Sequence, residues 1–156
     1  MLTIQQSTID IGPLPRLVLI ADRFTDPERA DRAVAAVRSG VRWVHLRDHR
    51  AERERFAERA RRLVRRLREA APDVGISVNT RLDVAASLGV HVHLGRRGPS
   101  VAHARRRLGA GVLVGYSAHA LDEAQDERLE EVDYFFFSPV YPTPSKPGHP
   151  GAGRSA

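Results

Sequence analysis

The chain has 156 residues and a formal net charge of +6, with 42% hydrophobic and 28% charged residues. It contains no cysteine, which excludes a disulfide framework and thiolate metal sites. No apolar run approaches the roughly 18 residues of a membrane span, and residues 1–15 lack the basic-then-apolar pattern of a signal peptide. We therefore expect a one-domain cytoplasmic protein with no membrane partner.

The first predicted elements are a strand at 17–21, a helix, and a second strand at 41–47. Asp26 can cap the helix, Pro27 suits its first turn, and Gly40 ends it. The order strand, helix, strand is the unit from which parallel sheets are built.

Nine of the 25 basic residues fall in the next segment, 50–68, and basic segments can indicate nucleic-acid binding. Here, however, the pattern is that of an amphipathic helix, because its apolar residues recur at steps of four, three and four. Glu58 and Arg62 form a favourable i,i+4 pair on its polar side. This pattern favours a solvated helix face over a nucleic-acid partner. The apolar residues are Phe56, Ala60, Leu63 and Leu67.

Four further apolar runs are candidate strands, and helical patterns lie between most of them. Gly89 and Gly109 close two short helices in this region. Alternating strands and helices indicate a parallel sheet built from right-handed βαβ units. The four runs are 75–79, 91–94, 112–117 and 134–138.

Several of these strands have one apolar face and one face that becomes polar toward the carboxyl end. Side chains alternate between the two faces of a strand, so Arg47, Asn79 and Ser117 lie on the polar faces of their strands. An open doubly wound sheet would need both faces apolar. The interior of a TIM (β/α)8 barrel instead opens into an active site at the carboxyl ends of its strands. The pattern therefore favours an α/β protein of the TIM-barrel type, with these three residues at its mouth.

The barrel is expected to be incomplete, because only six strands are apparent and a full barrel usually needs at least about 200 residues. We divide the chain into an N-terminal extension (1–16), a partial barrel domain of about six βα units (17–148) and a C-terminal tail (149–156), with strands seven and eight missing. Six parallel strands would leave two exposed edges and an open core. A homo-oligomer would cover those edges.

A proline-rich loop follows the sixth strand and carries Lys146, the only lysine in the chain. Three prolines stiffen this loop, so the hydroxyls of Thr143 and Ser145 could converge with Lys146 on an anion such as phosphate. A surface loop whose lysine faces water is the alternative.

Histidines carry the second candidate chemistry. His119 follows the fifth strand and could move protons near pH 7, or could simply be a capping or solvated residue. His45, His91 and His93 line the predicted interior. They could bind a metal, but the lack of Asp or Glu beside them in register favours packed, hydrogen-bonded histidines.

Four segments of the chain resemble those of a known protein family. WVHLRDHRA (43–51), SVNTRLDVAASLGVHVHLG (77–95), VGYSAHALDEA (114–124) and DYFFFSPVYPTPSKPG (133–148) occur in that order. Together they resemble the thiamine phosphate synthase/TenI superfamily, from about residue 17 onward. The resemblance implies a (β/α)8 barrel acting in thiamine biosynthesis.

The resemblance implies two activities. The synthase joins hydroxymethylpyrimidine diphosphate to thiazole phosphate, and magnesium helps the diphosphate to leave. The TenI-type protein binds thiazole phosphate without a metal and shifts a proton with a histidine as acid and base. By resemblance, the acid/base would be His119, and the substrate and phosphate contacts would be Arg47, Asn79, Ser117, Thr143, Ser145 and Lys146.

The chain departs from the synthase pattern where that family binds magnesium. Thr80 stands where one aspartate is expected, and the second falls in Arg96-Arg97-Gly98. A magnesium–diphosphate centre needs carboxylate oxygens. These departures favour a metal-independent, tautomerase-type reaction on a phosphorylated thiazole, with no cofactor. The alternatives are a synthase, which would use Mg²⁺, and a non-catalytic relic or regulatory binding protein.

Overall fold

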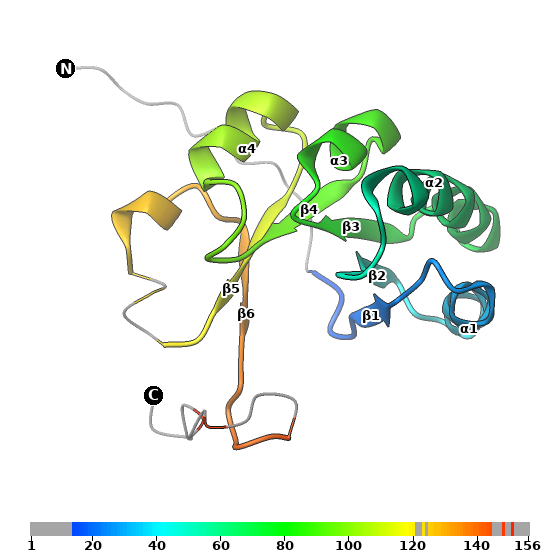
Figure 1. The fold of residues 1–156 in the computed structure, drawn as a ribbon, viewed down its shortest axis with the longest axis horizontal. Coiled ribbons are helices and arrows are strands. Elements are labelled where there is room, and N and C mark those ends of the chain that lie inside the picture. The colour runs from blue at the N-terminus through cyan, green and yellow to red at the C-terminus, as the bar shows by residue number, and fades with distance from the viewer. Residues whose placement is uncertain (1–13, 121–122, 124, 145–147, 149–150, 152–156) are drawn as a thin grey trace.

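The computed structural model describes residues 14–120, 123, 125–144, 148 and 151. Six strands alternate with helices, and each strand pairs in parallel with the next along the chain, in the order β1-β2-β3-β4-β5-β6 (Figure 1). The elements are β1 Leu19–Asp22, α1 Pro27–Arg38, β2 Trp43–Arg47, α2 Arg53–Ala70, β3 Gly75–Asn79, α3 Leu82–Leu88, β4 His91–Leu94, α4 Val101–Leu108, β5 Val114–Ala118, the 3₁₀ helix η1 Glu127–Leu129 and β6 Tyr134–Phe137.

The sheet curls into a half-barrel, and α1 to α4 lie in an arc around its outer side (Figure 1). This arrangement confirms the predicted incomplete α/β barrel. Parallel strands joined by helices have this form because each helix packs its apolar stripe onto the sheet it has just left.

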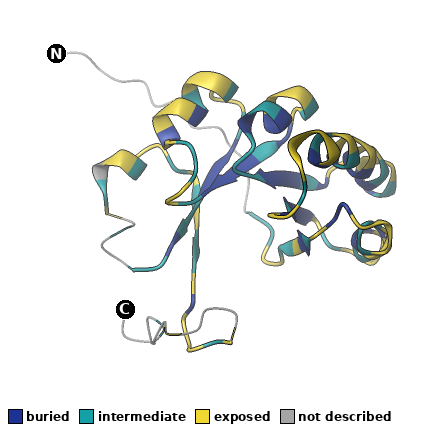
Figure 2. Ribbon diagram, in the orientation of Figure 1, coloured by how far each residue is buried: buried dark blue, intermediate teal, exposed yellow. Residues whose placement is uncertain are grey.

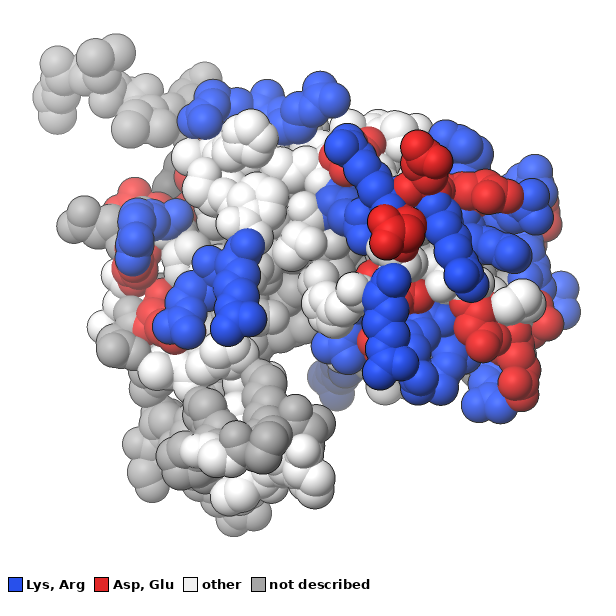
Figure 3. Space-filling view, in the orientation of Figure 1, with Lys and Arg blue, Asp and Glu red and all other residues white. Residues whose placement is uncertain are grey.

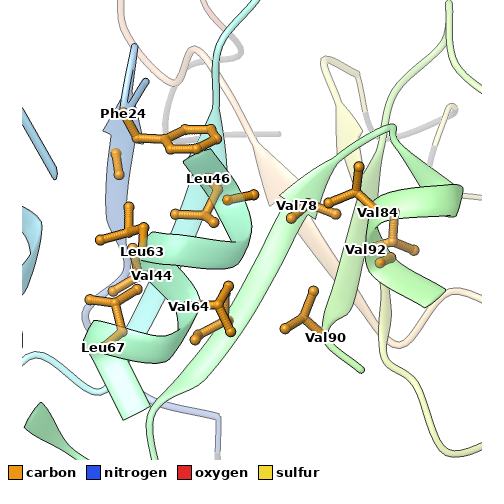
Figure 4. Packing of buried hydrophobic residues seen from close by; sticks show 14 of the residues in the cluster. Phe24, Val44, Leu46, Leu63, Val64, Leu67, Val78, Val84, Val90 and Val92 are labelled. Carbon is orange, nitrogen blue, oxygen red and sulfur yellow. The ribbon is translucent and has the colours of Figure 1, made fainter. Parts of the chain in front are cut away.

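The main core lies between the sheet and these helices (Figures 2 and 4). The carboxylate of Asp26 caps α1 by accepting the N–H of Glu28 at 2.9 Å, as the sequence predicted. The predicted stripe of α2 is buried, with Phe56 only 1% exposed. It packs against the outer faces of β2 and β3, where Leu46 and Val78 are fully buried. Each such side chain contributes roughly 1.5–3 kcal/mol of burial free energy.

The polar side of α2 is a solvated face. Glu58 and Arg62 form the predicted i,i+4 ion pair at 2.7 Å, and Arg66 pairs with Asp31 of α1 at the same distance. Acidic residues are interspersed with arginines over α1 and α2 (Figure 3). The positive charge of this surface is therefore broken up rather than continuous.

The inner face of the half-barrel is filled rather than open. The rings of Trp43 on β2 and Tyr134 on β6 meet edge to face with centroids 5.8 Å apart, and His93 stacks at a tilt on Phe136 at 4.2 Å. The expectation of an open core was therefore wrong for the part of the half-barrel that these rings occupy. Large rings from β2, β4 and β6 reach across the curled sheet there. Gly115 permits this contact, since a Cβ atom there would collide with Tyr134.

The two edges are exposed, as the sequence predicted. β1 and β6 form the ends of the sheet, and they expose Ile20 (47%) and Phe135 (36%). Within the described part of the chain, no helix combines the length and the apolar character needed to cross a membrane.

Candidate active site

The carboxyl ends of the six parallel strands form one rim, which we call the mouth. Arg47 is the last residue of β2 and Asn79 the last of β3, while Ser117 is the penultimate residue of β5 and His119 follows that strand. The four residues therefore lie at the same end of the sheet. Thr143, half-buried, follows β6. Ser145 and Lys146, the rest of the predicted anion-binding loop, lie outside the described residues.

Arg47 is oriented by a carboxylate that the sequence analysis missed. Asp22 is its register partner on β1, and its Oδ1 accepts a hydrogen bond from Arg47 Nε at 3.1 Å. Both side chains are 39% exposed, so this ion pair adds little stability. Its consequence is geometric: the guanidinium is held at the mouth with other donors available for an anionic ligand. The signal was the position of Asp22, directly after the first predicted strand.

Ser117 is held by an interior histidine. Its Oγ lies 2.8 Å from His93 Nε2. His93 is 2% exposed, and this burial lowers its pKa to about 4. The imidazole is therefore neutral near pH 7 and fixes the hydroxyl without placing a charge beside it. Its Nδ1 is buried and has no hydrogen-bond partner among the described residues, because the ring packs directly over Gly115.

A second hydrogen-bonded group lies deeper in the interior. Trp43 Nε1 donates to Ser77 Oγ at 3.1 Å, and the same oxygen lies 3.0 Å from His45 Nδ1. Burial lowers the pKa of His45 to about 3, helped by the nearby His93, Arg47 and His49. A neutral His45 can thus accept the hydroxyl hydrogen of Ser77. These contacts confirm the prediction of packed, hydrogen-bonded interior histidines.

His119 joins the segments that follow β5 and β6. Its Nδ1 lies 2.6 Å from the carbonyl oxygen of Ser138, and its backbone N–H donates to Glu123 Oε2 at 2.8 Å. A carbonyl oxygen only accepts, so Nδ1 carries the hydrogen. Nε2 is then the acceptor nitrogen of the neutral ring, the form that a general base requires.

Thr80, where the resemblance expects one magnesium-binding aspartate, is a spatial neighbour of the segment 96–98, where it expects the other. A Cβ atom at Gly98 would lie 3.0 Å from Thr80 Cγ2. Neither residue carries a carboxylate. In the ranges that the structure covers, no group of three or more His, Asp or Glu side chains could hold a metal ion. These residues do not fit Mg²⁺, which prefers carboxylate oxygens.

Comparison with known proteins decides the family. The model of a family described as thiamine monophosphate synthase matches residues 17–155. The chain belongs to this family. It is 39% identical over 144 residues to a thiamine-phosphate synthase of Thermobifida fusca, covering 88% of this chain and 64% of the relative. A thiamine-phosphate synthase of Azorhizobium caulinodans is 37% identical over 139 residues, with 87% and 65% covered.

Among solved structures, the thiamine phosphate pyrophosphorylase of Pyrococcus furiosus superposes with a TM-score of 0.70 at 26% identity. The match covers 81% of this chain and 61% of that one. This member of the thiamine monophosphate synthase family therefore spans less than two thirds of the length of the relatives it matches. The mouth described above comes from that shared portion.

Proposed function

We propose that this member of the family carries out the synthase reaction for which its relatives are named, and that its mouth binds the two phosphorylated substrates. The substrates would be those implied by the family resemblance, hydroxymethylpyrimidine diphosphate and thiazole phosphate. The observation that carries the proposal is Arg47, held by Asp22 at the carboxyl end of β2. The names of the relatives at 37% and 39% identity support the same reaction.

In this reaction the bond between the pyrimidine methylene carbon and the diphosphate oxygen breaks, and its electron pair leaves with the diphosphate. The thiazole nitrogen lone pair then forms the new carbon–nitrogen bond. Arg47 would neutralise charge that builds on the leaving oxygens. The Ser117 hydroxyl, held by His93 at 2.8 Å, would supply a further oriented hydrogen bond. Magnesium takes no part in the proposed step, because Thr80 and Gly98 do not provide carboxylate ligands for it.

A metal-independent proton shift on thiazole phosphate is the second candidate. It is favoured by His119, whose Nδ1 contact with the Ser138 carbonyl leaves Nε2 as the accepting nitrogen. It is also favoured by the same lack of carboxylates. In this reaction His119 Nε2 would remove a ring proton and return it to another ring atom, so that no group is gained or lost.

One set of assays separates the two candidates. Purified protein is incubated with both substrates, and thiamine phosphate is measured by chromatography; exchange of ring protons in thiazole phosphate alone is followed in D₂O by NMR. The synthase proposal expects product, and a rate at least about tenfold lower in Arg47→Ala. Arg38→Ala, at the exposed end of α1, is the charge-matched control.

The proton-shift candidate expects exchange that His119→Asn abolishes while the fold is retained. If Arg47→Ala forms product at the wild-type rate, the mouth does not bind the substrates as proposed. The absence of both product and exchange in the wild-type chain would overturn both candidates.

A further inference from the structure

A second cluster of positive charge lies outside the mouth, between the segments that follow β1 and β2. Four arginines line a cavity of about 250 Å³ there. We call this cavity the arginine pocket. Its arginines are Arg23, Arg29, Arg50 and Arg55.

The arginine pocket borders the mouth but does not include Arg47. Asp22 forms ion pairs both with Arg23 of the pocket, at 3.6 Å, and with Arg47 of the mouth, at 3.1 Å. Arg47 belongs to the inner face of the half-barrel, whereas Asp48, the next residue, lines the pocket on the outer side. Arg47 itself does not line the cavity. A ligand in the pocket would therefore lie beside the helices and not inside the half-barrel.

The floor of the pocket is built from a buried pair that joins its two segments. Thr25 Oγ1 donates to Asp48 Oδ2 at 2.6 Å, and the two residues are only 5% and 6% exposed. Asp48 Oδ1 also accepts the backbone N–H groups of Arg50 and Ala51 at 3.0 and 3.1 Å. Burial acts to raise the pKa of Asp48, but these hydrogen bonds and the charge of Arg55 outweigh it and lower the pKa.

The two carboxylates of the pocket, Asp26 and Asp48, only partly offset its four arginines. Both Asp48 oxygens are taken by the bonds described above, and Asp26 is used to cap α1. Within the described part of the chain, Arg29, Arg50 and Arg55 form no ion pair, whereas Arg23 pairs with Asp22 at 3.6 Å. The pocket therefore has an excess of positive charge over a rigid floor.

Two of these arginines lie where a positive charge is unfavourable for the stability of the fold. Arg29 lies in the first turn of α1 and Arg55 in the first turn of α2. The amino-terminal end of a helix carries partial positive charge, so a cation there is unfavourable by typically 0.3–1 kcal/mol. Neither residue forms an ion pair among the residues that the structure describes, and only Arg55 is attracted by a nearby carboxylate, that of Asp48. An anion bound between them would offset these two arginines, in addition to the negative charge that Asp26, Glu28 and Glu54 already place at the helix ends.

We propose that the arginine pocket binds a small phosphate-type anion, of the size of a diphosphate. Its volume is below the roughly 300–1,000 Å³ of pockets that hold drug-sized ligands. Guanidinium groups match the geometry of phosphate oxygens and bind them through paired hydrogen bonds. The site does not depend on the reaction proposed for the mouth.

Binding of inorganic pyrophosphate tests the proposal, with titration calorimetry for affinity and amide NMR for location. The pocket variant is Arg50→Gln/Arg55→Gln. The control is Arg106→Gln/Arg107→Gln on the exposed end of α4, which removes the same net charge elsewhere. We expect pyrophosphate to shift the amide signals of Thr25 and Ala51, and the pocket variant to bind at least about tenfold more weakly than the control.

Further measurements show where the anion binds. Mouth variant Arg47→Ala should leave the shifts at Thr25 and Ala51 in place, whatever it does to the synthase assay. Inorganic phosphate should bind more weakly than pyrophosphate, because it offers fewer oxygens to the four arginines. Shifts confined to Ser117 and His119, or equal weakening in the pocket and control variants, would overturn the proposal.

Discussion

A Cβ atom added at Gly98 would lie 3.0 Å from the methyl group of Thr80, so the residues that follow β3 and β4 are in contact at the mouth. This contact joins Thr80, where the family resemblance expects one magnesium-binding aspartate, to the segment 96–98, where it expects the other. Thr80→Asp/Gly98→Asp would place two carboxylates side by side. The two positions are thus close enough to share a metal ion, but the side chains present there carry no carboxylate to bind it.

We expect MgCl₂ to raise the free energy of unfolding of the double variant Thr80→Asp/Gly98→Asp. The wild-type chain should show no comparable increase. A ligand at a hundred times its dissociation constant stabilises the folded state by about 2.7 kcal/mol. Urea unfolding with and without MgCl₂ measures this. Thr80→Asn/Gly98→Asn keeps the side-chain size without the charge and should not respond. An equal response of the Asn variant would show that the effect does not come from the new carboxylates.

Thr80 also has an unfavourable backbone conformation. Its φ is +57°, in the left-handed region that a β-branched residue rarely adopts. Asn tolerates this region, so Thr80→Asn should raise the free energy of unfolding by about 1 kcal/mol. Thr80→Val keeps the branched shape and should bring no gain. Equal stability of the Asn and Val variants in urea unfolding would contradict the strain.

Gly115 is required by the rings that fill the half-barrel. A Cβ atom there would lie 2.2 Å from Tyr134 Cζ and 2.5 Å from His93 Nδ1. Both neighbours are packed, so Gly115→Ala should lower the free energy of unfolding by about 1–3 kcal/mol. A Cβ atom at Gly111 would have no neighbour within 4 Å, and Gly111→Ala should change stability by less than about 0.5 kcal/mol. Thermal or urea unfolding of the two variants compares them directly.

The number and the order of the strands could be predicted from the sequence. It predicted β3 and β4 with their observed bounds, because apolar residues alternate with polar ones between clear helix ends. It began the first strand too early, at residue 17, because Leu17 is apolar; in the structure Leu17 is 64% exposed and precedes β1. The order of the strands followed from the alternation of strands and helices.

The contacts between strands could not be predicted in the same way. Asp22 meets Arg47, and His93 meets Ser117, only because adjacent strands pair in one particular register. That register is set by packing on the helices and not by either strand alone. The contact of Trp43 with Tyr134 depends in addition on how tightly the sheet curls. The sequence therefore indicated the residue types at the mouth but not the partners that hold them.

Acid should destabilise the fold through the interior imidazoles. Burial lowers the pKa of His45 to about 3 and that of His93 to about 4, from 6.5 in an unfolded chain. Between these values and pH 6.5 the unfolded chain binds protons that the folded chain does not. The free energy of unfolding therefore falls as the pH is lowered from about 6.5 toward 4, by about 1.4 kcal/mol per pH unit for each imidazole.

Urea unfolding at a series of pH values measures this slope. His45→Gln keeps a hydrogen-bonding group near Ser77 but cannot titrate, so it should remove about half of the pH dependence even if it lowers stability at pH 7. His103→Gln changes an exposed histidine on α4 and should leave the slope of the wild-type chain. If His45→Gln and His103→Gln had the same slope, His45 would have to titrate equally in the folded and unfolded chains, contrary to its 2% exposure.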